Sequence, residues 1–225
     1  MRGPEVGQRD GEPNQKTDWR RDAADAAHAA TVLEAEDRWQ VGDHPANYRW
    51  THVQRVVRLA LRLAELTGAD GEVVEAAAWL HDIAKKGRDD DHGVRGSIQA
   101  RAVLTTTDFP RDKIDAVVDA IAKHVGLWTE EPVTPLEAAV VWDADKLSKL
   151  GVAAEMQFLG GYVLARRGSL DTLLRDTAAE QAWQERTLAS FHSEAALVAG
   201  RTRWRAQRRL RRAVAAELCG DDLAT

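Results

Sequence analysis

The sequence predicts an all-α protein, and the spacing of its apolar residues is the main reason. Alanine, leucine and valine recur every three or four positions through most of the chain, which is the period of an amphipathic helix. Only six Pro and two Tyr are present, and no convincing strand pattern appears. Hydrophobic residues make up 44% of the 225 positions, enough for one sizeable core. We therefore expect a helical bundle with an N-terminal helix and a C-terminal helical extension.

The charge and the cysteine content indicate a cytoplasmic protein. The net charge is −5 and the pI is about 5.8, so the global charge does not favour nucleic acid as a partner. A single cysteine, Cys219, excludes an internal disulfide framework and is typical of a reducing compartment. No run approaches the roughly 18 apolar residues of a membrane span, and residues 1–18 lack the apolar core of a signal peptide. We expect a soluble, cytoplasmic protein with no membrane contact.

The N-terminal part begins with a polar tail. Glycine, proline and charged residues dominate residues 1–18, which predicts a disordered segment. A first helix is expected from Trp19 to about Trp39, where apolar residues follow helical spacing. Residues 19–168 are expected to form the main helical domain, and residues 169–225 a C-terminal helical extension packed on it.

The next two helices carry the first candidate site residues. One is expected at about 46–66, and apolar residues at +4, +7 and +11 from His52 place this imidazole on the core side. The following helix starts at Asp70 and ends in the adjacent pair His81-Asp82. Two polar residues at the end of an apolar helix are costly to bury unless something binds them.

Three further helices continue the pattern. One runs from about His92 to Thr105, and the second has Pro110 in its first turn and reaches His124. The third runs from a capping box at Thr134 to Leu150, with Asp143 in the middle of its apolar stripe. Burying an uncompensated carboxylate costs several kcal/mol, so a cation is expected beside Asp143.

Two or three more helices are expected at about 152–167, 169–190 and 193–218. Seven arginines lie within residues 201–212, and apolar side chains such as Trp204 share another face of the last helix. The arginines are interpreted as a solvated face, with a polyphosphate or acidic partner as the alternative. This helix is also a candidate contact in a homodimer.

Six residues form a candidate divalent metal centre. They are His52, His81, Asp82, His92, His124 and Asp143. Imidazole together with carboxylate suits Mn, Fe, Co, Ni or Zn, and Mg is a further candidate. Neighbouring residues point about 100° apart on a helix, so His81 and Asp82 meet one centre only off the helix end, or if Asp82 bridges two ions. The interpretation requires that residues 52 and 143 lie beside this pair.

Four short strings carry a resemblance to a known family. In order along the chain they are Trp50-Thr51-His52-Val53, residues 79–85 (WLHDIAK), Asp91-His92-Gly93 and residues 141–147 (VWDADKL). Together they resemble the HD-domain superfamily of metal-dependent phosphohydrolases, over roughly residues 46–165. The resemblance implies an all-α fold, one or two divalent ions, and a metal-activated water that attacks phosphorus.

The resemblance also implies which residues would hold each ion. The first ion would take His52, His81, Asp82 and Asp143. A second ion, as in binuclear branches of the superfamily, would take Asp82, His92 and His124. The string around His81-Asp82 locally resembles the branch that cleaves symmetrical dinucleoside tetraphosphates, whereas some single-metal nucleotidases carry an acidic residue at the place of Lys85.

Several charged residues near the strings are candidates for substrate contact. Asp82 and Lys85 are the predicted catalytic residues, with Lys85 steadying phosphoryl oxygens. The predicted phosphate contacts are Lys85, Lys86, Arg95 and Lys146. Two interpretations of Asp145 stay open, that it orients a metal ligand or that it lies on the surface.

Each candidate also has an ordinary structural interpretation. His92 could cap the helix that follows it, His124 could interact with a helix C-terminus, and Asp143 could pair with a Lys or Arg. Taken one by one, Lys85, Lys86 and Arg95 are interpreted as ordinary solvated charges. The remaining histidines, His28, His44 and His192, are interpreted as structural or exposed. The joint order of the six ligands favours the metal site.

The sequence therefore predicts a metal-dependent phosphohydrolase. Its expected substrate is a small phosphorylated molecule, a phosphate ester or anhydride of a nucleotide. Two alternatives stay open: a mixed-valent diiron oxygenase similar to myo-inositol oxygenase, which shares the ligand pattern, and a non-catalytic nucleotide-binding protein.

Overall fold

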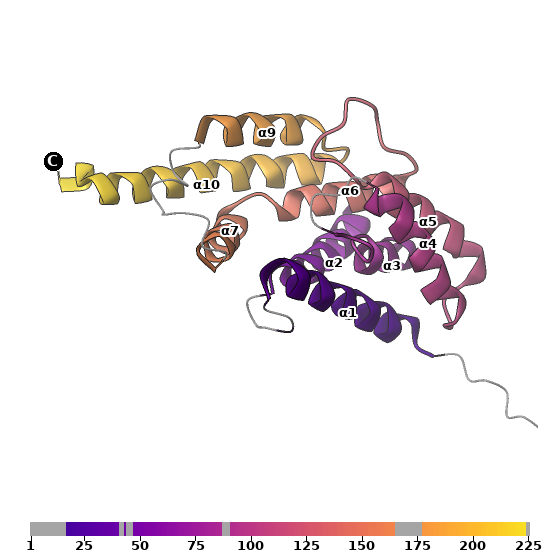
Figure 1. Ribbon diagram of the computed structural model, residues 1–225. Helices are drawn as coiled ribbons and strands as arrows, with labels where there is room; N and C mark the ends of the chain where they lie inside the picture. The colour runs from indigo at the N-terminus through magenta and orange to yellow at the C-terminus, as the bar shows by residue number, and fades with distance from the viewer. Residues whose placement is uncertain (1–16, 41–42, 44–46, 87–90, 165–176, 224–225) are drawn as a thin grey trace, which may run out of the picture.

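The protein is a bundle of α-helices, as the sequence predicts. The computed structural model describes residues 17–40, 43, 47–86, 91–164 and 177–223 (Figure 1). Nine α-helices are present among these residues: α1 (Trp19–Trp39), α2 (Tyr48–Thr67), α3 (Gly71–Leu80), α4 (His92–Thr105), α5 (Ile114–Lys123), α6 (Leu136–Ser148), α7 (Val152–Leu164), α9 (Thr177–Ala189) and α10 (Glu194–Cys219). No β-strand occurs in this described part, in which Thr17 and Thr107 form one isolated bridge.

The helix ends follow the local sequence signals. Asn47 caps α2 by accepting a hydrogen bond from the Trp50 amide, and Asp70 caps α3 in the same way. Helix α2 ends at Gly68, whose φ of 78° is the left-handed conformation that glycine adopts without strain. The predicted capping box at Thr134 does not form, because α6 begins after Pro135 without a side-chain cap. Glu137 instead accepts a hydrogen bond from the Asp70 amide and ties α6 to α3.

The core lies between the helices that carry the candidate ligands. Helix α2 packs between α3 and α6, and α4 packs along α5. Alanine and valine dominate the buried surface of α3, so neighbouring helices approach it closely. Helix α1 covers α2 and α3, while α10 runs outward from α6 between α7 and α9 (Figure 1).

The domain boundaries remain predictions. The predicted disordered tail falls almost wholly outside the described residues, and so does the predicted boundary at 168/169. Among the described helices, none is long and apolar enough to cross a membrane.

Gly93 allows the close approach of α4 and α5, which carry His92 and lead to His124. A Cβ at this position would lie 2.6 Å from Val125 Cγ2 and 3.0 Å from the Ala122 carbonyl oxygen. We expect Gly93→Ala to lower the free energy of unfolding by about 2 kcal/mol, the usual cost of overpacking. Urea denaturation followed by circular dichroism measures the change.

Gly71→Ala is the matched control. It also adds one methyl group to the first turn of a helix, but nothing lies within 4 Å of the added carbon. We expect its stability to stay within about 1 kcal/mol of the wild type. Equal losses in the two variants would show that the α4–α5 approach does not depend on Gly93.

Candidate metal centre

Six buried side chains converge from different helices. Three of them come from the end of α3 and from α2, and the others from the start of α4, the residue after α5, and α6. They are His52, His81, Asp82, His92, His124 and Asp145. Each lies within 3.6 Å of at least one other member. Five of the six are those that the sequence predicts, and Asp145 stands where Asp143 was expected.

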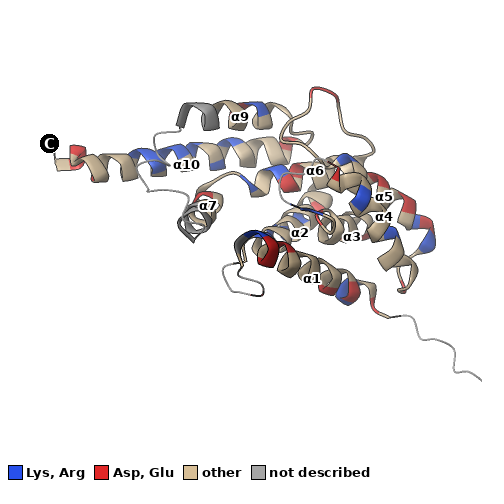
Figure 2. Cartoon of the chain, in the orientation of Figure 1, with Lys and Arg blue, Asp and Glu red and all other residues tan. Residues whose placement is uncertain are grey.

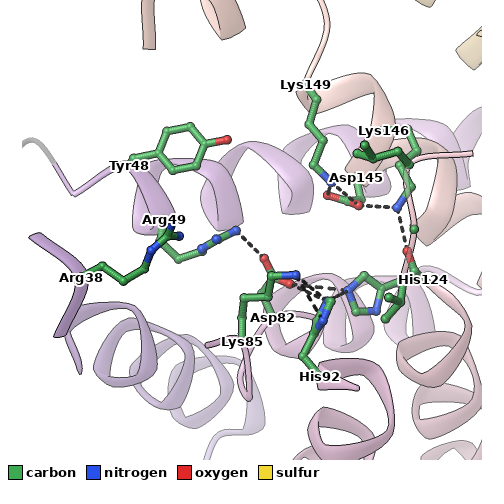
Figure 3. Close-up of a pocket in the computed structure, with 13 residues that line it drawn as sticks. Arg38, Tyr48, Arg49, Asp82, Lys85, His92, His124, Asp145, Lys146 and Lys149 are labelled. Carbon is green, nitrogen blue, oxygen red and sulfur yellow. Dashed lines mark hydrogen bonds and ion pairs between the residues drawn. The ribbon is translucent and has the colours of Figure 1, made fainter. Parts of the chain in front are cut away.

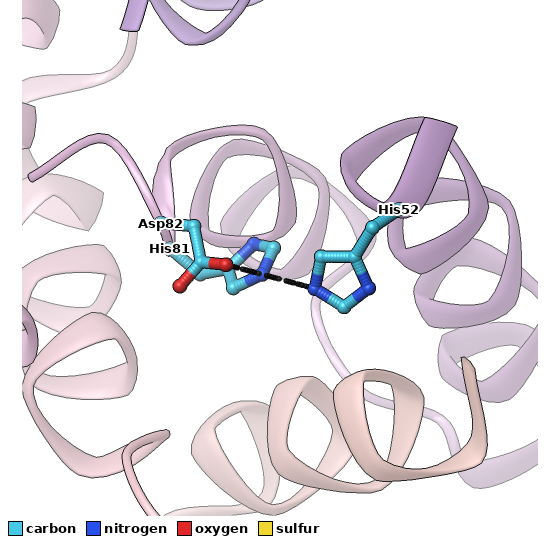
Figure 4. A group of neighbouring side chains, drawn as sticks. All are labelled: His52, His81 and Asp82. Atoms are coloured by element: carbon cyan, nitrogen blue, oxygen red, sulfur yellow. Dashed lines mark hydrogen bonds and ion pairs between the residues drawn. The ribbon is translucent and has the colours of Figure 1, made fainter. Parts of the chain in front are cut away.

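The Asp82 carboxylate lies at the centre of this cluster. Its Oδ2 is 3.6 Å from Nε2 of both His52 and His81 (Figure 4). Its Oδ1 is 3.4 Å from Nε2 of His92 and 3.5 Å from Nε2 of His124 (Figure 3). Asp82 is therefore shared by two pairs of imidazoles, one on each carboxylate oxygen, which is the arrangement of a bridging ligand.

Backbone carbonyls fix the orientation of two of these imidazoles. Nδ1 of His81 lies 2.8 Å from the Ala78 carbonyl oxygen, and Nδ1 of His124 lies 2.6 Å from that of Ile121. A carbonyl only accepts hydrogen bonds, so Nδ1 carries the proton and the lone pair of Nε2 points into the cluster. Protein metal sites orient their histidine ligands in this way.

Ser148 gives His52 the same tautomer, with the proton on Nδ1. The Ser148 hydroxyl donates to the Asp145 carbonyl oxygen at 2.7 Å, so it accepts from Nδ1 of His52, 3.1 Å away. Burial lowers the pKa of His52 to about 4, and it does the same to the pKa of His124. These imidazoles are neutral at physiological pH, with lone pairs available for a cation.

The two carboxylates stay ionised for a different reason. Burial raises the pKa of Asp82, but the charge of the Arg49 guanidinium counters this effect, and the pKa stays well below its usual value. Burial likewise raises the pKa of Asp145, and the charges of Lys146 and Lys149 lower it well below the usual range. Neutral imidazoles next to ionised carboxylates suit a divalent transition metal.

The structure does not bring Asp143 into the cluster. One of its oxygens accepts from the His192 amide at 2.9 Å, and the other accepts from the Ser193 amide at 2.8 Å and the Ser193 hydroxyl at 2.7 Å. Asp143 therefore binds the N-terminal end of α10, and these hydrogen bonds compensate its burial. Asp145 Oδ1 lies 3.2 Å from Nε2 of His52, so the carboxylate of α6 that contacts the cluster is that of Asp145, not that of Asp143.

A cavity of about 690 Å³ opens over the cluster (Figure 3). Lys85 lines it, and its Nζ lies 3.2 Å from Nδ1 of His92. Lys146 also lines it but is buried, and it donates at 2.6 Å to both Asp145 Oδ2 and the His124 carbonyl oxygen. Burial lowers the pKa of Lys146 to about 8. Lys146 thus holds Asp145 and the backbone at His124, two members of the cluster, in place.

The other two predicted phosphate contacts lie elsewhere. Lys86 and Arg95 line a neighbouring cavity of about 660 Å³, between α1, the turn after α3, and α4. Neither of them lines the cavity above the cluster, so their phosphate contact stays a prediction from the sequence. Lys85 lines both cavities and separates them.

Sequence analysis missed Arg49, a buried side chain in contact with the cluster. Its Nη1 donates to Asp82 Oδ2 at 2.8 Å, and its Nε donates to Glu34 Oε2 of α1 at 2.7 Å. Arg49 precedes His52 by three residues, and this spacing on one helix face was the available signal. Three further residues lining the cavity were also missed: Arg38, Tyr48 and Lys149.

Comparison with known sequences places this site in a family. Residues 49–150, which include all six clustered side chains, match the HD domain. The chain carries an HD domain. Glu34, the ion-pair partner of Arg49, lies outside this domain, on α1.

Relatives of known sequence cover part of this chain. The chain is 34% identical to ribonuclease Y of Bacillus subtilis over 112 residues, which are 50% of this chain and 20% of that protein. It is 30% identical to YpgQ, an uncharacterized protein of Bacillus subtilis, over 126 residues that are 52% of this chain and 60% of YpgQ. The chain thus spans less than two thirds of each relative.

Solved structures of HD-superfamily proteins share the fold. An HD-superfamily hydrolase from Bacillus thuringiensis aligns with a TM-score of 0.61 at 18% identity, covering 88% of this chain and 98% of that one. Bacillus subtilis YpgQ in complex with ADP aligns with a TM-score of 0.61 at 20% identity, covering 86% and 97%. At these identities the likeness shows the all-α HD fold.

Substitutions at the two aspartates of α6 separate their roles. Asp143→Asn should lower the free energy of unfolding by about 2 kcal/mol, because charge-assisted hydrogen bonds to α10 are lost. It should leave the metal affinity unchanged. Asp145→Asn should weaken metal binding by about tenfold or more, because a carboxylate beside His52 is removed. Urea denaturation and calorimetric Mn²⁺ titration measure the two properties. Metal loss in Asp143→Asn alone would restore the ligand set predicted from the sequence.

Glu34→Gln tests whether α1 belongs to the site. Buried Arg49 has two acidic partners, Asp82 and Glu34. If a metal binds Asp82, Glu34 becomes the main counter-ion of Arg49. We expect the affinity for pyrophosphate to fall about tenfold, because Arg49 is no longer held at the cavity. Binding is measured by calorimetry on protein saturated with Mn²⁺. The control is Glu36→Gln, an exposed site on the same helix. Identical affinities in the two variants would exclude α1 from the site.

Proposed function

We propose that this protein is a metal-dependent phosphohydrolase that cleaves a phosphate anhydride of a nucleotide. The observation that carries the proposal is the Asp82 carboxylate, shared by two buried imidazole pairs at the base of a cavity lined with cations. The geometry fits the six-ligand binuclear pattern, with Asp145 in the place predicted for Asp143. We propose His52, His81, Asp82 and Asp145 for one ion, and Asp82, His92 and His124 for a second.

The cations around the cavity support an anionic substrate. Arg38, Arg49, Lys85 and Lys149 line it, whereas its lining acids are the proposed ligands Asp82 and Asp145. Once divalent ions neutralise these two carboxylates, the remaining charge of the lining is positive. A chain of several phosphates fits such a lining better than a single neutral group does.

Each group has a defined part in the proposed reaction. Bound divalent ions would lower the pKa of a water and neutralise charge that develops on phosphorus. Arg49 and Lys85 would hold the phosphoryl oxygens. Both line the cavity beside the cluster, where Arg49 contacts Asp82 and Lys85 contacts His92. Lys146 would keep Asp145 and the backbone at His124 in place. The Tyr48 ring at the same cavity would contact the nucleoside part.

Similar proteins also support a nucleotide as the substrate. YpgQ has been crystallised in complex with ADP, and a second structural neighbour is an HD-superfamily hydrolase. The identity with ribonuclease Y favours a second candidate, cleavage of a phosphodiester bond. A nucleotide anhydride is preferred because the cavity is lined by cations on several sides.

Metal analysis followed by a substrate screen tests the proposal. We expect up to two divalent ions per chain, and metal-dependent release of phosphate or pyrophosphate from nucleoside di- or triphosphates. The screen includes Mn, Co, Ni, Fe and Mg, and an RNA oligonucleotide reports phosphodiester cleavage. His81→Ala and Asp82→Ala should each lower the rate by at least about a hundredfold, the upper range for losing a residue that merely supports a ligand.

Three results would contradict the proposal. Phosphate release that survives both substitutions would show that the cluster does not catalyse it. A mixed-valent diiron EPR signal with substrate-dependent O₂ uptake would instead favour the oxygenase. Tight nucleotide binding without turnover in every metal would favour the non-catalytic alternative.

A further inference from the structure

Helix α10 has a charge opposite to that of the whole chain. The chain carries a net charge of −5, but α10 contains seven arginines and two glutamates among its 26 residues. No acidic residue lies between Ala195 and Ala216. Figure 2 shows the basic residues gathered along this helix, where it extends away from α6. The overall acidity therefore hides a strongly basic surface.

Five of these arginines share one face of the helix. They lie at relative positions 0, 4, 7, 8 and 11, which bring side chains to one side of an α-helix. They are Arg201, Arg205, Arg208, Arg209 and Arg212. Arg208 is partly buried over the Trp204 ring, and the other four are exposed. None of the five forms an ion pair with another described residue. We call these five the arginine face.

The other two arginines fix the helix to the bundle. Arg203 donates to the Leu147 carbonyl oxygen at 2.8 Å, and Arg211 donates to the buried Glu155 of α7 at 2.8 Å. Gln207 joins them by donating to Glu155 and accepting from the Gly151 amide. These contacts hold one side of α10 against α6 and α7. The arginine face is thus presented by a fixed helix over about 16 Å, at 1.5 Å per residue.

We propose that the arginine face binds the phosphate backbone of a single-stranded nucleic acid. Guanidinium groups bind phosphate oxygens in bidentate pairs, and a row one helical turn apart fits a polymer of regularly spaced charges. The row lacks the exposed aromatic or aliphatic centre that a protein–protein interface needs. A duplex is less suitable, because α10 packs on α6, α7 and α9 and is not a free helix that enters a groove. This surface does not depend on the chemistry proposed for the metal centre.

Salt-dependent binding tests the proposal. Fluorescence anisotropy of the full chain is measured with a labelled 20-nucleotide single strand and with the matching duplex. Five phosphate contacts on a single strand give a slope of log affinity against log salt of about −3.5, so the affinity should fall about a hundredfold between 50 and 200 mM salt. R205Q/R209Q/R212Q removes three contacts, and its affinity should fall only about sevenfold over that range.

A matched triple variant controls for net charge. R62Q/R101Q/R111Q removes the same charge from exposed arginines on other elements and should keep the wild-type slope. Circular dichroism confirms that both variants fold. No binding at low salt, equal slopes in the two triple variants, or tighter binding of the duplex would each overturn the proposal. So would a dimer, seen by analytical ultracentrifugation, that R205Q/R209Q/R212Q alone dissolves.

Discussion

The Asp82 carboxylate is the group on which the arrangement of the site depends. Two ionised oxygens buried among helices are costly unless charge compensates them. Arg49 supplies part of this compensation, and burial keeps the His52 and His124 imidazoles neutral at physiological pH. The remaining attraction is available for cations between the carboxylate and the imidazole nitrogens. The packing of α2, α3, α5 and α6 therefore serves to keep one charged side chain in place.

The site extends beyond the HD domain. Glu34 lies on α1, before the first residue of the matched segment, and it is nearly as buried as the six clustered side chains. Its ion pair with Arg49 means that α1 contributes charge to the site as well as covering the core. Burial lowers the pKa of Arg49, but the charges of Asp82 and Glu34 outweigh this effect and raise the pKa above its usual value. The guanidinium therefore stays charged. Arg49 is therefore a permanent cation at the edge of the cluster.

Most of the fold and five of the six clustered residues could be predicted from the sequence, because periodic apolar residues and the His81-Asp82 pair are local signals. The choice between Asp143 and Asp145 could not. Both lie on α6, and nearly every side chain of this helix is buried, so an apolar stripe does not single out one face. Which aspartate meets the imidazoles depends on where α2 and α10 pack. Arg49 and Glu34 were missed for the same reason, since their partners are distant in sequence.

Helix α6 contacts both the clustered side chains and α10, through two aspartates that lie two residues apart. A separation of two residues turns the side chain by about 200°, so Asp143 and Asp145 face opposite sides. Asp145 faces His52 and the cavity, while Asp143 holds the N-terminal end of α10. Arg203 of α10 binds back to the Leu147 carbonyl at the end of the same helix. The position of α10, and of the arginines it presents, is therefore set by the same helix that carries Asp145 of the candidate metal centre.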